Sequence, residues 1–211
     1  MNKLTKIAAL VVAVLAAYSP ISFAATESTP AINVSAQVGS ALSITADLFK
    51  NSVSAPNDIA DTTMNFGTLT TDLGGGVFSD NLRSSTQGST GTGSVVALVS
   101  AVSNAGTQYT ITQTGTSMQS GGNSLPSGAC TVVPVYTDAD NNGQTIVGAL
   151  GTPGSWIGTR TIYTSNATGS GRVIQTHYSI TDDPDAGATT GVPLNQPAGT
   201  YTGTVTFTVT V

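Results

Sequence analysis

The stretch AGTYTGTVTFTVTV, residues 198–211, carries the alternation that decides the fold. Threonines separate large apolar residues at every second position: Tyr201, Val205, Phe207, Val209 and Val211. A period of two is typical of a β-strand with one apolar face. Such a strand cannot satisfy its backbone or bury its apolar face alone, so we expect it to pair with another strand.

The same period recurs along the chain, and no segment after residue 24 has the spacing of an amphipathic helix. Strands are predicted at residues 31–38, 41–46, 64–69, 94–102, 107–113, 130–137, 144–150, 156–164, 172–180 and 201–211. Turn-forming residues separate them, with a hairpin expected at residues 135–148 and a long surface connection at residues 182–199. This pattern predicts an all-β sandwich or barrel.

Residues 1–24 have the features of a secretory signal peptide. Lys3 and Lys6 precede a short apolar run, and small residues before Ala24 offer a cleavage site. The run is too short to span a bilayer, which argues against the alternative of a retained anchor. We therefore expect an exported chain with an N-terminal segment at residues 25–40 and one domain at residues 41–211.

The composition of the mature chain argues against several partners. About 187 residues remain after cleavage, enough for one β domain with a buried core. Four basic residues face eleven acidic ones, and a net charge of about −7 disfavours nucleic acid and anionic membranes. No later stretch is long and apolar enough for a spanning helix, so we expect no membrane insertion of the mature chain.

Reactive side chains are few. Cys130 is the only cysteine, so it either pairs between chains or, as its apolar neighbours favour, stays buried and free. His177 is the only histidine and lacks the partners of a zinc site or a catalytic triad. Trp156 is interpreted as a core or rim residue rather than a ligand platform. We expect no cofactor and no enzyme, with a secreted enzyme using His177 and Asp182 as the remaining alternative.

Two groups of acidic residues have side chains of the type that binds cations. Asp138, Asp140 and Asn142 precede a glycine as in the front half of a calcium loop. The twelfth position of that loop would be Ala149, where calcium needs a glutamate. We interpret the group as a polar turn, with calcium as a weak alternative, and residues 182–185 as a solvated loop.

A second alternating strand opens the mature chain at INVSAQV, residues 32–38. Its apolar positions are Ile32, Val34, Ala36 and Val38. Like the strand at residues 201–211, it must add to a sheet, either its own or that of a neighbour.

Three stretches together resemble the spore-coat-U-like pilins of the archaic chaperone–usher class. They are INVSAQV, the MNFGTL element at residues 64–69, and the ending PAGTYTGTVTFTVTV. The ending is the most specific of the three, and together they cover about a quarter of the mature chain.

The resemblance implies an incomplete immunoglobulin-like sandwich that is completed by donor-strand exchange. Ile32, Val34, Ala36 and Val38 would be donor residues; the acceptor groove would be edged by Tyr201, Val205, Phe207, Val209 and Val211. The expected partners are like subunits, a periplasmic chaperone and an outer-membrane usher. The expected product is a cell-surface fimbria, reached through the periplasm, or a spore-coat-like assembly.

The residues also leave a different class of function open. A self-contained secreted sandwich, acting as a binding module or a tip adhesin, would use the long loops at residues 118–129 and 182–199 to contact a ligand.

Overall fold

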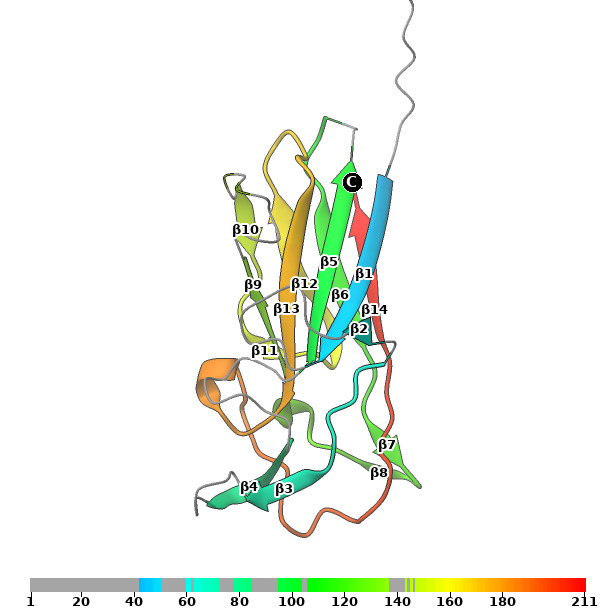
Figure 1. Ribbon diagram of the computed structural model, residues 1–211, viewed down its shortest axis with the longest axis vertical. Helices are drawn as coiled ribbons and strands as arrows, with labels where there is room; N and C mark the ends of the chain where they lie inside the picture. The colour runs from blue at the N-terminus through cyan, green and yellow to red at the C-terminus, as the bar shows by residue number, and fades with distance from the viewer. Residues whose placement is uncertain are drawn as a thin grey trace, which may run out of the picture. The chain divides into compact units, whose positions relative to one another are not determined.

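The computed structural model describes residues 42–50, 60–61, 63–72, 78–84, 95–103, 106–136, 143, 145 and 147–211. All of them belong to the second of the two units into which the chain divides, Gly39–Val211. The described strands form two larger antiparallel sheets and two short two-stranded sheets (Figure 1). The expectation of an all-β fold is therefore confirmed for this part of the chain.

The larger sheet has six described strands in the order β11-β9-β13-β5-β1-β2. Their bounds are β11 Gly154–Ser155, β9 Cys130–Val135, β13 Arg172–Ile180, β5 Val95–Ser103, β1 Leu42–Lys50 and β2 Ala60–Asp61. The two central strands, β13 and β5, are buried on both faces along most of their length. The near-continuous apolar run of β5, VVALVSAVS, is typical of a strand covered on both sides.

The smaller sheet has four described strands in the order β10-β12-β6-β14. Their bounds are β10 Gly148–Leu150, β12 Gly158–Ser165, β6 Thr110–Gly115 and β14 Val205–Thr210. Burial alternates residue by residue along β6 and β14, as the threonine-rich sequences of both strands predict. One face of this sheet therefore lies on the core and the other faces solvent.

The hydrophobic core joins the two larger sheets. Val99 and Ile174 enter it from the six-stranded sheet, while Ile111 and Ile162 enter it from the four-stranded sheet. Aromatic rings add contacts at both ends: Tyr109 with Tyr163, and Trp156 with Tyr178, with ring centroids 5.9 Å and 6.5 Å apart. The two sheets thus pack face to face around one apolar layer.

Short elements close the end of the unit away from the start of β1 (Figure 1). They are the paired strands β3 Leu69–Asp72 and β4 Phe78–Ser84, the paired strands β7 Gln119–Ser120 and β8 Asn123–Ser124, and the 3₁₀ turns η1 Ser127–Ala129 and η2 Pro184–Ala186. No helix in the described part of the chain is long and apolar enough to cross a membrane.

Two local predictions are wrong. Residues 64–68 are not a strand, and β3 begins only at Leu69, because Gly67 adopts a positive φ of 69° that interrupts the extended chain. The strands that flank the hairpin predicted at residues 135–148 do not pair with each other, because β9 pairs with β13 in one sheet whereas β10 pairs with β12 in the other. The connection therefore crosses between sheets.

The predicted surface connection at residues 182–199 is only partly exposed. Ala186 and Val192 are buried, and Leu82 of β4 donates its backbone N–H to the Val192 carbonyl at 2.8 Å. The segment is thereby attached to β4, while Leu194 stays exposed.

Candidate functional site

Strand β14 lies at the edge of the four-stranded sheet, with β6 as its ladder partner. The side chains of Val205, Phe207 and Val209 are half-buried against the core, whereas Thr206 and Thr208 are exposed. Among the described residues, no strand pairs with the opposite edge of β14. The apolar face of this strand is thus covered from one side only.

The backbone of β14 directs its polar groups alternately to β6 and to the edge at which no described strand pairs. The N–H of Thr116 donates to the Thr204 carbonyl at 2.9 Å, and Thr112 Oγ1 donates to the Thr208 carbonyl at 3.5 Å. Thr204 and Thr208 therefore direct their backbone toward β6. Because successive residues of a strand alternate, the N–H and C=O groups of Val205, Phe207 and Val209 point to the open edge.

Strand β1 lies beside β14 on the same side of the sandwich (Figure 1). It pairs with β5 along its length, and the described pairs on its other edge join Leu48 and Phe49 to β2. Ile44 and Leu48 pack against the core, but most described side chains of β1 are exposed. Two incompletely paired strand edges are consequently neighbours.

The residues predicted to edge an acceptor groove are only partly brought together. Val205, Phe207 and Val209 share one face of β14, and Val211 follows them with an exposed side chain. Tyr201 lies before the strand begins and lines a separate pocket. The predicted donor residues at positions 32–38 lie outside the described residues.

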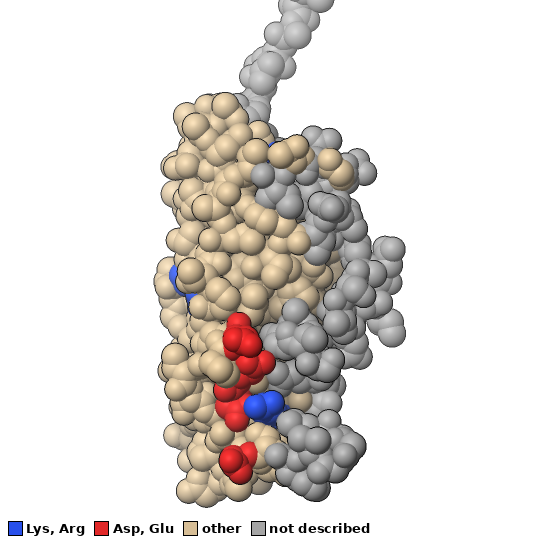
Figure 2. Space-filling view, turned by 90° about the vertical axis from the view of Figure 1, so that its left-hand side faces the viewer, with Lys and Arg blue, Asp and Glu red and all other residues tan. Residues whose placement is uncertain are grey.

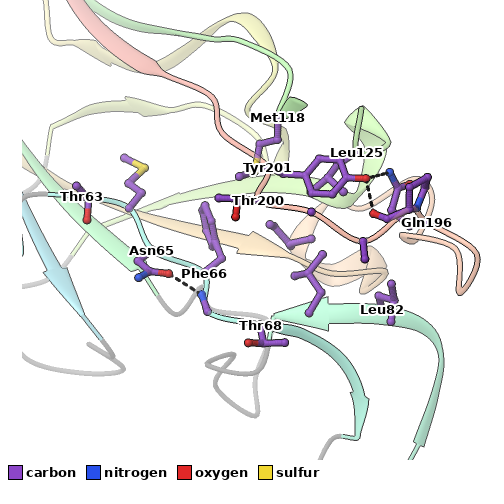
Figure 3. A pocket seen from close by; sticks show the side chains of 17 residues that line it. Thr63, Asn65, Phe66, Thr68, Leu82, Met118, Leu125, Gln196, Thr200 and Tyr201 are labelled. Carbon is purple, nitrogen blue, oxygen red and sulfur yellow. Dashed lines mark hydrogen bonds between the residues drawn. The ribbon is translucent and has the colours of Figure 1, made fainter. Parts of the chain in front are cut away.

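The pocket lies at the end of the sandwich and has a volume of about 680 Å³. Figure 3 shows the segment at residues 63–68 facing the segment at residues 196–201 across it. Its large apolar lining residues include Met64, Phe66, Leu69, Met118, Leu125 and Tyr201. Two of the three resemblance stretches, MNFGTL and PAGTY, therefore meet at one place.

Hydrogen bonds fix one wall of this pocket. Tyr201 Oη donates to the Pro197 carbonyl at 2.7 Å, and Gln196 Nε2 donates to Tyr201 Oη at the same distance. On the facing wall, Phe66 stacks on Trp156 with ring planes 8° apart. Met118, Leu125 and Gln196 lie in the two loops, residues 118–129 and 182–199, that the binding-module alternative uses to contact a ligand. No periodicity in those loops singles out the three residues themselves.

The described residues that line the pocket include no carboxylate, imidazole, amine or thiol. It can hold an apolar group and offer amide and hydroxyl hydrogen bonds, but it lacks a nucleophile paired with a base. His177 lies elsewhere, buried in β13 between Val96 of β5 and Val133 of β9.

The predicted solvated loop at residues 182–185 is instead a structural anchor at Asp182. Asn81 Nδ2 donates to Asp182 Oδ2 at 2.9 Å, and Arg83 forms a salt bridge with the same carboxylate. Burial raises the pKa of Asp182, but the hydrogen bond from Asn81 and the charge of Arg83 outweigh it and leave the pKa below its ordinary value. Figure 2 shows the acidic residues gathered beside a basic side chain on this face.

The other candidate residues have structural places. Cys130 is free and buried, as its apolar neighbours predicted, and Trp156 is a core residue. The weak calcium candidates Asp138, Asp140 and Asn142 lie outside the described residues. The described part of the chain holds no cluster of three metal-ligating side chains.

Comparisons of the chain with protein-family models, with curated proteins and with solved structures found no match.

Proposed function

We propose that the protein is an exported structural subunit that polymerises when the N-terminal strand of one copy adds to the β14 edge of the next. The observation that carries the proposal is the edge of β14 at which no strand of the described residues pairs. Natural edge strands avoid unwanted pairing through charges, prolines, bulges or short length. Strand β14 has six residues, VTFTVT, with none of these charges or prolines.

The proposed donor, residues 31–38, matches what this edge lacks. It is an alternating strand with apolar Ile32, Val34, Ala36 and Val38. Added to β14, it would satisfy the outward backbone groups and cover the half-buried side chains from the open side. Burial of four such side chains contributes on the order of several kcal/mol before ordering costs.

The proposed fold is an immunoglobulin-like sandwich that lacks one strand. The adjacent edges of β1 and β14 support this proposal, because a strand added to β14 would lie next to β1. A contact between the N-terminal segment of one copy and the edge of another is heterologous and does not close, so filaments follow.

A route to the cell surface completes the proposal. The free edge of β14 would need cover before assembly, and a periplasmic chaperone that lends a strand, followed by an outer-membrane usher, would supply it. The product would be a surface fimbria or a spore-coat-like assembly. The support for this route is the signal-like N-terminus and the resemblance of the ending.

The test compares thermal unfolding and particle size of the exported chain with those of a variant carrying residues 31–39 fused after Val211 through a flexible linker. A matched control fusion carries Val34→Asp and Val38→Asp in the added copy. We expect the first fusion to raise Tm by on the order of 10 °C and to convert oligomers into monomers. An already stable monomer that gains no more from this fusion than from the control would contradict the proposal.

The pocket favours a second candidate function, a binding module. Its volume of about 680 Å³ suits a small ligand with an apolar body and a polar end that reaches Gln196. Glycan or small-molecule binding by a monomer, lost on Phe66→Ala, would favour this candidate over the structural subunit.

A further inference from the structure

We propose a specific register for the added strand, which rests on the proposed function: residues 32–38 of a second copy run antiparallel to β14 and place Ala36 directly opposite Phe207. The partner is thus a second copy of this chain. The remaining pairs on the core side then follow as Val38 with Val205, Val34 with Val209 and Ile32 with Val211.

Face alternation excludes half of the possible registers. Directly opposite residues of an antiparallel pair lie on the same face of the sheet. Val205, Phe207 and Val209 face the core and Thr206, Thr208 are exposed. A slip by one residue would place the apolar residues of the donor on the solvent face, so only registers that pair apolar with apolar positions remain.

Side-chain size selects one of the remaining registers. The largest side chain on this face of β14 is Phe207, and the smallest apolar side chain of the donor is Ala36. A shift of two residues in either direction would place Val34 or Val38 against the half-buried Phe207 ring. A shift in one direction would also place Val38 opposite Gly203, which offers no side chain to cover.

The backbone of β14 agrees with this register. Val205, Phe207 and Val209 direct their N–H and C=O groups to the open edge, so their partners Val38, Ala36 and Val34 would form the hydrogen-bonded pairs. The exposed pairs Ser35 with Thr208 and Asn33 with Thr210 would be the closely spaced pairs without hydrogen bonds.

The antiparallel direction follows from where the strands begin. Leu42 pairs with Ser103 at the same end of the unit as Thr210 with Thr110, and Val205 lies at the other end (Figure 1). In the antiparallel direction, Val38 of the donor leaves at the Val205 end, away from the start of the acceptor's own β1. Copies can then follow one another head to tail.

Disulfide trapping in the full chain tests the register. Closely spaced antiparallel pairs have Cα atoms about 4.5 Å apart, within the range for a disulfide, whereas diagonal neighbours are about 7–8 Å apart. Ser35→Cys is combined in turn with Thr206→Cys, Thr208→Cys or Thr210→Cys. All three threonines are exposed on β14, and the native thiol of Cys130 is buried.

We expect covalent multimers with Thr208→Cys at about tenfold or higher yield than with the other two positions. Preferential bridging at Thr206→Cys or Thr210→Cys would overturn the register while leaving strand addition intact. Asn33→Cys checks the direction: it should bridge to Thr210→Cys, and bridging to Thr206→Cys would mean a parallel strand. A disulfide formed within a single chain would contradict the proposal that the added strand comes from a second copy.

Exchanging the sizes of the side chains at positions 36 and 207 tests the proposed pair independently. Ala36→Phe should lower the assembled fraction about tenfold or more, because two large rings would meet, and Phe207→Ala in the same chain should restore it. Circular dichroism on the Phe207→Ala single variant controls for folding. Failure of rescue with a folded variant would overturn the Ala36–Phe207 pair. Wild-type chains that do not assemble, together with cysteine variants that do not bridge at any pair, would overturn the proposed function as well.

Discussion

The Tyr178 hydroxyl on β13 donates a hydrogen bond to Gln113 Oε1 on β6 across the core, at 2.5 Å. Gln113 in turn donates from Nε2 to the Trp156 carbonyl at 3.0 Å. Both side chains are buried, and the Gln113 amide provides hydrogen-bond partners for the Tyr178 hydroxyl and for the Trp156 carbonyl inside the core. Because Gln113 also lies opposite Phe207 in the β6–β14 ladder, this network supports the strand that bears the open edge.

Removal of the Tyr178 hydroxyl should therefore destabilise the domain. Tyr178→Phe leaves Gln113 Oε1 buried without this donor, and we expect a loss of about 1–3 kcal/mol in the free energy of unfolding, measured by urea denaturation. Tyr201→Phe removes the same atom at a half-buried site where water can replace it, so its loss should be smaller. Equal losses for both variants would contradict the cross-sheet role.

The carboxylate of Asp182 should make stability depend on pH. Its pKa is lower in the folded protein than in the unfolded chain, because the Asn81 hydrogen bond and the Arg83 charge outweigh burial. Its contribution is therefore complete above the unfolded pKa of about 3.9 and is lost as the pH falls through the folded pKa.

We expect Asp182→Asn to lower the free energy of unfolding at pH 7 by about 1–3 kcal/mol. Denaturation series at decreasing pH should then show a shallower acid loss in the variant than in the wild type. Parallel curves for the two proteins would show that the Arg83–Asp182 pair does not contribute to the acid transition.

The Cys130 thiol should be inert in the folded protein. Burial raises its pKa to about 12, so almost no thiolate exists at neutral pH. We expect a maleimide reagent to label Cys130 only after unfolding, and non-reducing gels to show no disulfide-linked dimer. Labelling of the native chain at the rate of an exposed thiol would contradict this placement.

The strand at residues 172–180 shows that the sequence pattern can predict the bounds of a strand. It was predicted with the bounds that β13 has, since its apolar and β-branched run is bounded by glycines and a proline. The predicted strand at residues 201–211 begins instead at Val205. Thr202 bridges to Gln119 and Thr204 bonds to Thr116, so the partner of the chain changes around Gly203 although the alternation continues.

Features that depend on distant partners were not predictable from local pattern. The sequence at residues 135–148 resembles a hairpin, but the sheet that each flanking strand joins is decided by β13 and β12. Asp182 looked like a loop residue because its partners Asn81 and Arg83 are about a hundred positions earlier. The alternation of apolar residues and threonines along β14 was predicted, since it is a local property of the sequence.

Proline substitutions on β14 should distinguish the edge that pairs with β6 from the opposite edge. Proline lacks an N–H and is tolerated in edge strands where that group faces outward. Val209 directs its N–H to the open edge, whereas Thr208 directs its backbone to β6. Val209→Pro therefore removes a donor that only an added strand would use, and Thr208→Pro removes one from the β6–β14 ladder.

We expect Val209→Pro to reduce assembly about tenfold with little loss of monomer stability, and Thr208→Pro to cost about 1 kcal/mol or more in the free energy of unfolding. Light scattering measures assembly, and urea denaturation of assembly-blocked chains lacking residues 25–38 measures stability. The opposite pattern, in which Val209→Pro destabilises the domain but assembles normally, would contradict the assignment of the Val209 N–H to the open edge of β14. Val209 also packs against the core whereas Thr208 is exposed, so the difference between the two variants combines the direction of the backbone with the loss of one half-buried side chain.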